Sequence, residues 1–268
     1  MQQCKWAMVF SAVAALVLSV AYFLSLAFEK TQARVCENSA IRMARSLKSY
    51  RDAHGGRLPP PFIRDKETGQ RHGWRVILLP YVTDDFLYGT YDFRQPWNHP
   101  INRQIGNPRK GIPVTGYACA AHTYSSDMTN YIAVVGENTL WPEPEEPTDY
   151  EYTTVGADNV RWPAPQGNDV PPDGSAKIVL VELVRSNIPW MTPSDITLDE
   201  FIAAVEKNPE GEFFNSHVNG IRAIDASGQL TVIDPYDDSD SIRRRFLVAD
   251  EEAASDSPTR GNADESAP

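Results

Sequence analysis

The chain is 268 residues long and carries 36 acidic against 25 basic residues, which gives a formal net charge of −11. Two segments, 143–151 and the tail from Asp250, hold about −10 of this charge, so the remainder is nearly neutral. Nucleic-acid binding requires a clustered basic surface and is not favoured by this distribution. The length is sufficient for one domain with a sizeable core, or for two small ones.

An uncharged apolar run from Trp6 to Phe28 dominates the N-terminal end of the chain. A transmembrane helix needs about 20 such residues, so we predict a membrane span at 6–28, preceded by a short stub at 1–5. A cleavable signal peptide is the alternative, because Ser25 and Ala27 are small and two residues apart, as at a cleavage site before Phe28. We favour the uncleaved anchor because the run is longer than the apolar core of a signal peptide.

The membrane helix is predicted to continue into water as far as Ala53. After Glu29, apolar residues recur every three or four positions, at Ala33, Cys36, Ala40, Met43, Ala44, Leu47 and Tyr50. This spacing places one apolar stripe along a helix, and no Pro or Gly interrupts 6–53. A continuous helix of about 45 residues would be roughly 70 Å long. Gly55, Gly56 and the prolines at 59–61 are typical of its end.

Short elements follow these prolines. The apolar block 74–81 is compatible with either a helix or a strand, and Thr83-Asp84-Asp85 is typical of a capped helix start. The β-branched runs 130–135 and 178–183 predict buried strands.

Further along the chain, Thr197 and Glu200 fit a capping box that opens a helix to about Lys207. Residues 221–225 and 230–233 predict a hairpin around Ala226-Ser227-Gly228.

The remaining segments define the domain and its limits. The proline-rich stretches 142–147 and 163–172 are predicted to be surface loops, and the tail 249–268 is predicted to be disordered. We therefore predict an α+β fold in one domain, 29–248, with a long N-terminal helix packed on a mostly antiparallel β-sheet. Residues 29–53 form the part of this helix that belongs to the domain.

Three cysteines occur in the chain. Cys4 lies at the membrane edge, whereas Cys36 and Cys119 share the water-facing part. These two could form one disulfide in an oxidising compartment, or they could remain two buried thiols.

An ordered series of motifs covers most of 36–233. Its members are Cys36-Glu37-Asn38, 50–60, 73–81, Leu87-Tyr88, 91–93, Pro96-Trp97-Asn98, Asn102, 129–136, Asp173-Gly174-Ser175, 178–182, Trp190-Met191, Pro193, Asp195, His217, Gly220 and 225–228. In this order they resemble the pseudopilin-like proteins of domain-of-unknown-function family 1559 (DUF1559), which are abundant in planctomycete bacteria.

The resemblance implies a pseudopilin-like build, with a long N-terminal helix half in the membrane and half packed on an antiparallel sheet. It implies export across the inner membrane and no particular reaction. One departure matters: related proteins often begin with Gly before Phe-Thr-Leu-x-Glu, a site read by a prepilin peptidase. Here no Gly precedes the apolar run and no Glu lies inside its start, so processing and fibre incorporation are in doubt.

The basic residues near the span give a contrary signal for topology. Lys5 precedes the span, whereas Lys30, Arg34, Arg42, Arg45 and Lys48 follow it, and this count favours a cytoplasmic domain. Long domains can translocate despite such charges. Following the resemblance, we expect a single-pass inner-membrane protein whose domain is extracytoplasmic.

Two tryptophan motifs could recognise a ligand. Trp74 could stack on one while Arg75 binds a carboxylate, but the apolar residues around them favour a core position with local pairing of Arg75. The Trp97-Asn98-His99 motif could bind a sugar, although its flanking prolines favour a structural corner.

Two other motifs have the residue types of catalytic or metal sites. Ser216 and His217 suggest nucleophile chemistry, but catalysis needs a base and an orienting group, so we favour a backbone hydrogen bond for His217. The carboxylates of Asp234, Asp237, Asp238 and Asp240 could gather calcium, yet their spacing does not fit an EF-hand and a solvated loop is favoured. We assign no catalytic residue, metal ligand or cofactor.

The leading expectation is a non-enzymatic, membrane-anchored envelope protein with a structural or interaction role. Its partners would be the lipid bilayer, through 6–28, and other envelope or pseudopilin-like proteins. An alternative is an envelope module that binds a glycan or peptide through exposed aromatics such as Trp97, Trp141, Trp162 or Trp190. A weaker alternative is a hydrolase built around His217.

Overall fold

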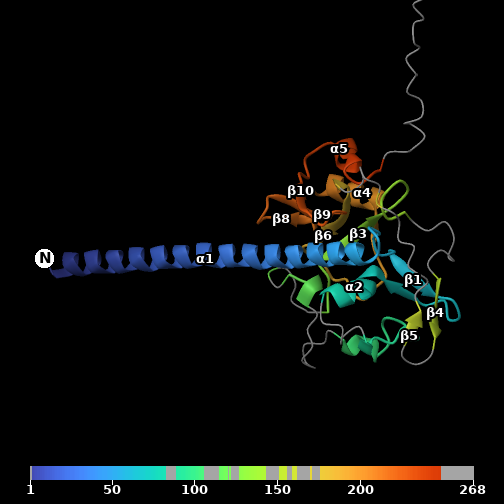
Figure 1. Cartoon of the computed structure of the whole chain (residues 1–268). Helices are drawn as coiled ribbons and strands as arrows, with labels where there is room; N and C mark the ends of the chain where they lie inside the picture. Colours follow the sequence, from blue (N-terminus) through green and yellow to red (C-terminus); the bar gives the residue numbers. More distant parts are fainter. Residues whose placement is uncertain are drawn as a thin grey trace, which may run out of the picture.

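In the computed structural model, one helix of 52 residues, α1 (Gln2–Ala53), extends from a body of mixed sheets and short helices (Figure 1). The structure describes residues 2–82, 89–105, 115–119, 121, 127–142, 151–155, 159–161, 170 and 176–248. The prediction of one continuous helix to Ala53 is confirmed. The helix ends where the Gly56 N–H donates to Arg51 O (2.8 Å) and Gly55 adopts a φ of 66°, a conformation that glycine adopts without strain.

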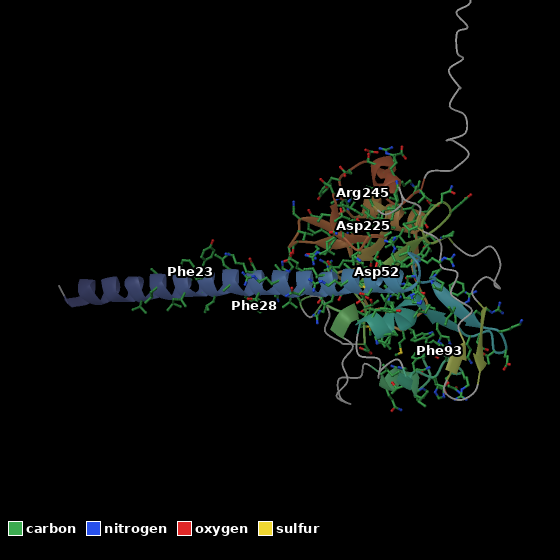
Figure 2. The ribbon with its side chains drawn as sticks, viewed as in Figure 1. Phe23, Phe28, Asp52, Phe93, Asp225 and Arg245 are labelled. Carbon is green, nitrogen blue, oxygen red and sulfur yellow. A yellow bond between two sulfur atoms is a disulfide. The ribbon has the colours of Figure 1, made fainter. Side chains whose placement is uncertain are left out.

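The two parts of α1 have different surroundings. Between Val13 and Phe28 most of its large apolar side chains are exposed, and Phe23 and Phe28 project from a length of helix that none of the described elements covers (Figure 2). From Cys36 onward the predicted stripe is buried, with Ala40, Met43 and Leu47 fully enclosed. The second part of α1 therefore packs its apolar face on the domain, as its amphipathic pattern predicts.

The main sheet has the strand order β10-β9-β6-β3-β7, with β8 paired to β9. The strands are β3 (Tyr131–Val135), β6 (Ile178–Glu182), β7 (Ile196–Thr197), β8 (Phe214–Asn215), β9 (Gly220–Asp225) and β10 (Leu230–Ile233). All pairings are antiparallel except that of β3 with β7. The predicted strands and hairpin are confirmed, and the sheet is mixed because of this one parallel edge.

Both faces of the main sheet are covered, which explains why β3 and β6 are buried throughout rather than alternating between buried and exposed residues. On one face, α1 and α2 (Trp74–Val82) pack against Ala133 and Leu180. On the other face, α4 (Leu198–Lys207) and α5 (Ser239–Arg244) pack through Phe201 and Ile242. The domain is thus an α+β fold with helices on both faces of the sheet.

A second sheet, in the order β2-β1-β4-β5, lies beyond the C-terminal end of α1 (Figure 1). It consists of β1 (Phe62–Asp65), β2 (Arg71–Gly73), β4 (Glu151–Val155) and β5 (Asn159–Arg161). Its β1–β4 pairing is parallel. Two 3-10 turns, η1 (Asn102–Gln104) and η3 (Thr115–Tyr117), are also present in the described part of the chain.

The ambiguous block 74–81 is helical, as α2. The capping box is confirmed: Thr197 Oγ1 accepts from the Glu200 N–H (3.2 Å), and Glu200 Oε2 accepts from the Thr197 N–H (2.9 Å). The predicted helix start at Thr83-Asp84-Asp85, most of the two proline-rich loops and the tail 249–268 lie outside the described residues.

Candidate functional site

The Asp195 carboxylate accepts three hydrogen bonds, from donors on two elements of the chain. Its Oδ1 accepts from Trp74 Nε1 (3.0 Å), Arg75 Nη2 (3.1 Å) and the Ala133 N–H (3.0 Å). α2 supplies the first two donors and β3 the third, so Asp195 ties the loop before β7 to both elements. Its side chain is 8% exposed.

Arg75 is wholly buried and is held by more than this ion pair. Its Nε and Nη2 donate to Tyr131 O (3.0 and 2.7 Å), and Nη1 donates to Thr192 O and Ser194 O (3.3 and 3.4 Å). Burial lowers the pKa of its guanidinium, while Asp195 opposes that shift. The two groups thus satisfy each other inside the domain, which agrees with the core role favoured for Trp74 and Arg75.

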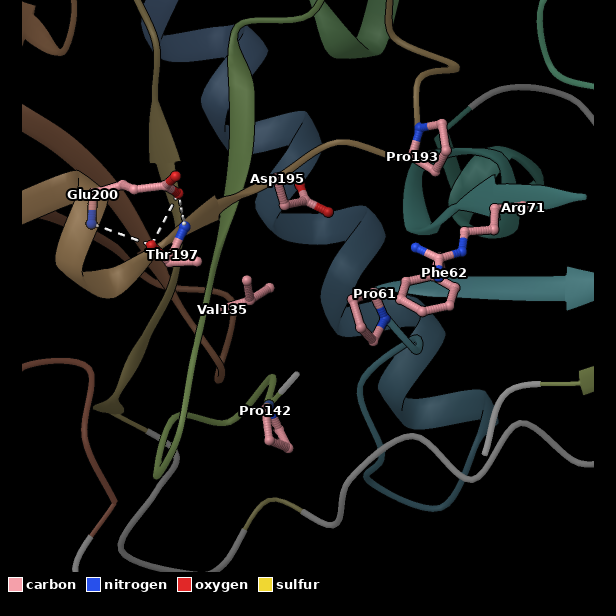
Figure 3. A pocket seen from close by; sticks show the side chains of 9 residues that line it. All are labelled: Pro61, Phe62, Arg71, Val135, Pro142, Pro193, Asp195, Thr197 and Glu200. Carbon is pink, nitrogen blue, oxygen red and sulfur yellow. Dashed lines mark hydrogen bonds between the residues drawn. The ribbon is translucent and has the colours of Figure 1, made fainter. Parts of the chain in front are cut away.

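A pocket of about 440 Å³ opens beside Asp195, where the two sheets meet. Figure 3 shows Asp195, Thr197 and Glu200 on one side of it and Phe62 and Arg71 on the other. The remaining lining residues are apolar: Pro61, Val135, Pro142 and Pro193. A volume of this size is in the range of small-molecule sites.

The charged groups of the pocket differ in how they are engaged. The Arg71 guanidinium carbon lies 4.5 Å from the ring centroid of Phe62, so this cation rests over an aromatic face. On the opposite side, hydrogen bonds from the Thr197 N–H and hydroxyl lower the pKa of the Glu200 carboxyl. Burial raises the pKa of the Asp195 carboxyl, against the effects of Arg75 and the hydrogen bonds to Oδ1.

A second buried polar group lies beside α1. Cys36 and Cys119 form a disulfide (Cα–Cα 5.2 Å), which settles the choice between a disulfide and two thiols. The Glu182 carboxylate approaches both sulfurs, accepts from Asn215 Nδ2 (2.7 Å) and lies 3.5 Å from Arg222 Nη1. Burial raises the pKa of Glu182, opposed by Arg222. Because the sulfurs are bonded to each other, they are not available as thiolate metal ligands.

Of the tryptophans proposed for stacking, the three that the structure describes, Trp97, Trp141 and Trp190, do not line the pocket. Trp141 and Trp190 are buried, so the expectation that they are exposed is wrong. Trp141 stacks near Trp74 (5.7 Å between centroids) and donates from Nε1 to Pro59 O, whereas Trp190 stacks on Tyr117 (5.2 Å). Trp97 is partly buried against the core, and Trp162 lies outside the described residues.

The other motifs have local structural roles. The corner after Trp97 is held by Asn102, whose Nδ2 donates to Asp92 O, Gln95 O and Pro96 O. His217 is half-buried, and its backbone N–H donates to Asn215 Oδ1 (2.9 Å).

In the acidic loop, carboxylates accept hydrogen bonds from nearby backbone. Asp234 Oδ1 accepts from the Tyr236 N–H (3.0 Å), and Asp238 Oδ1 accepts from the Ser241 N–H (2.8 Å) to cap α5. These bonds account for the two carboxylates as turn and helix-capping groups.

Asp195 is the site residue that sequence reasoning missed. The sequence places it only in the motif series, because its partners at 74, 75 and 133 are too distant in sequence to reveal the pocket. The signal that the sequence offers is an Asp two positions before the predicted capping box.

These features define an α+β protein with a long N-terminal helix that is apolar enough to cross a membrane, as in a membrane anchor or signal sequence. Comparison with known families matches residues 32–170 to a family described as a protein of unknown function, DUF1559. The match spans just over half of the chain, and the chain belongs to this family. No curated protein and no solved structure matches it.

Proposed function

We propose that this protein is a membrane-anchored, pseudopilin-like component of the cell envelope with a non-enzymatic structural or interaction role. The observation that carries the proposal is the division of α1. Its first part is apolar and uncovered, as a lipid-facing helix requires, and its second part is packed on the sheet. A rigid helix would thus join the bilayer to the domain.

The disulfide supports an extracytoplasmic domain. Disulfides persist in oxidising compartments and are rare in the cytosol. Cys36 lies on α1 only eight positions beyond Phe28, so the bond forms close to the expected membrane surface. This argument favours export despite the basic residues that follow the span.

The N-terminal sequence lacks the Gly and Glu of a prepilin-type processing site, and the proposed role takes this into account. Without Gly before the run and Glu within its start, we propose that the chain stays anchored and acts through contacts of its domain. A binding module is the second candidate, favoured by the pocket beside Asp195 rather than by tryptophan stacking.

The test is protease accessibility of the full chain in a Gram-negative host. In intact spheroplasts we expect protease to remove the domain, and mass analysis of untreated protein to give an N-terminus at or near Met1. Protection of the domain until the inner membrane is lysed would overturn the proposed topology. A mature N-terminus at Phe28 would instead identify a cleaved signal peptide.

A matched pair of variants tests the anchor itself. Leu16→Lys/Val20→Lys places two charges where the helix is apolar, at a cost of about 2.5–3.5 kcal/mol each near the bilayer centre. We expect loss of membrane retention. Glu37→Lys/Asn38→Lys introduces two lysines on an exposed face beyond the span and should remain in the membrane fraction.

A further inference from the structure

The pocket is lined by Asp195, one of whose carboxylate oxygens is not engaged by the described residues. All three hydrogen bonds to this carboxylate go to Oδ1. Among the residues that the structure describes, none donates to Oδ2, and Figure 3 shows the Asp195 side chain among those that line the pocket. The Asp195 side chain is only 8% exposed, so little water can reach its carboxylate, and this position favours a ligand that brings a donor.

The hydrogen bonds to Asp195 also preorganise its carboxylate as an acceptor. Trp74, Arg75 and Ala133 hold Oδ1 from three directions, so the carboxylate need not reorganise when a ligand arrives. Preorganisation of this kind lowers the cost of binding. Glu200 adds a second carboxylate on the same side, fixed by the capping box at the start of α4.

The apolar lining residues indicate which chemical groups the rest of the ligand should carry. Pro61, Pro142, Pro193 and Val135 present apolar side chains, and proline has no N–H to offer. These apolar side chains can pack against the aliphatic part of a ligand. A hydrated Ca²⁺ ion would need six to eight oxygen ligands, whereas only Asp195 and Glu200 bring carboxylates to the pocket. An organic cation fits this lining better than a metal ion.

We propose that the pocket binds a primary ammonium group carried on an aliphatic chain, with Asp195 Oδ2 and the Glu200 carboxylate as its acceptors. The ammonium supplies three donors and a positive charge, and the chain lies against the prolines. The lysine side chain of a peptide and a free aliphatic diamine share this chemistry. The inference does not depend on membrane anchoring, because every lining residue lies beyond α1 in the sequence.

Calorimetric titration of the full chain in detergent micelles tests the proposal with three probes: Nα-acetyl-lysine methylamide, its Nε-acetylated derivative and cadaverine. We expect the free-amine lysine compound to bind with a Kd in the millimolar range or tighter, and the Nε-acetylated compound not to bind. Additional binding of cadaverine would mark a site for free amines, and its failure a site for lysine side chains. Equal binding of both lysine compounds, or no binding of either amine, would overturn the proposal.

Variants that remove one charge test whether the amine binds in this pocket. Glu200→Gln removes a charge but keeps a side chain that can complete the capping box, and should weaken binding about threefold to fivefold. Glu206→Gln makes the same change on an exposed position of α4 outside the pocket lining and should leave the Kd unchanged. Arg71→Gln removes the opposing cation and should tighten binding about twofold to threefold. Equal affinity in the Glu200 and Glu206 variants would exclude this pocket as the site.

Discussion

Arg75 and Asp195 form an ion pair across 120 positions of sequence, with 3.1 Å between Nη2 and Oδ1. The guanidinium is fully enclosed, and the carboxylate belongs to a side chain that is 8% exposed and lines the pocket. This pair joins α2 to the loop that leads into β7. It therefore connects α2, which packs against α1, to a residue that lines the pocket. Its integrity should decide both the stability of the domain and the shape of the pocket.

Arg75→Met should lower the free energy of unfolding by about 3–5 kcal/mol, because it leaves Asp195 as a buried charge without its partner. The double variant Arg75→Met/Asp195→Asn should lose less than the sum of the two single losses. Urea unfolding followed by tryptophan fluorescence measures each value. Additive losses would show that the two groups are not coupled.

An exposed ion pair provides the control. Lys48 and Asp52 are 2.6 Å apart on α1, with side chains 59% and 64% exposed. Lys48→Met should change the free energy of unfolding by about 0.5 kcal/mol or less, since exposed pairs of this kind contribute little.

The disulfide is expected to contribute strongly to stability. It closes a loop between residues 83 positions apart, and the chain-entropy relation gives about 4–5 kcal/mol for a loop of this length. Cys119→Ser should therefore lower the thermal midpoint markedly, as should reduction. Cys4→Ser removes a cysteine outside the disulfide and should leave the midpoint unchanged. Alkylation of all three cysteines rather than of Cys4 alone, counted by mass spectrometry after unfolding without reductant, would contradict the bond.

His72 should make the domain acid-sensitive. It is fully buried, with Nε2 3.0 Å from Phe93 O and Nδ1 2.7 Å from the Tyr91 hydroxyl. Burial lowers its pKa from 6.5 to about 4, despite the opposing effects of Phe93 O, Asp65 and Asp92. Between these values the unfolded chain binds the proton more readily, so stability is lost as the pH falls from about 6.5 to 4.

The expected loss from this one group is about 3 kcal/mol, from the shift in its pKa. Unfolding at a series of pH values in wild type and His72→Gln measures it. The variant should be less stable at pH 7 and should show a shallower pH dependence across this window. Parallel curves for the two proteins would show that His72 does not cause the acid sensitivity. Buried Glu182 and Asp195 act in the opposite direction, because their raised pKa values favour the folded state at lower pH.

Local patterns were readable from the sequence, and distant pairings were not. The stripe along α1, the capping box at Thr197 and the hairpin around Gly228 depend on residues within a few positions of one another, so their spacing was sufficient. The role of Asp195 depends on α2 and β3 meeting the loop before β7. Likewise, the pairing of Cys36 with Cys119 depends on a Cα separation that spacing does not reveal.

A close backbone approach at Gly73 gives the last prediction. A Cβ at this position would lie 3.1 Å from Pro193 Cα and 3.2 Å from Thr192 O, so a side chain would push against the loop that carries Asp195. Gly73→Ala should cost about 1–3 kcal/mol of unfolding free energy, as overpacking does, and should weaken amine binding by displacing Asp195. Gly89→Ala is the matched control, because a Cβ there meets nothing within 4 Å and should leave both properties unchanged. If Gly73→Ala is as stable as Gly89→Ala and binds as tightly, then the loop is not held at this contact and the position of Asp195 depends on its hydrogen bonds alone.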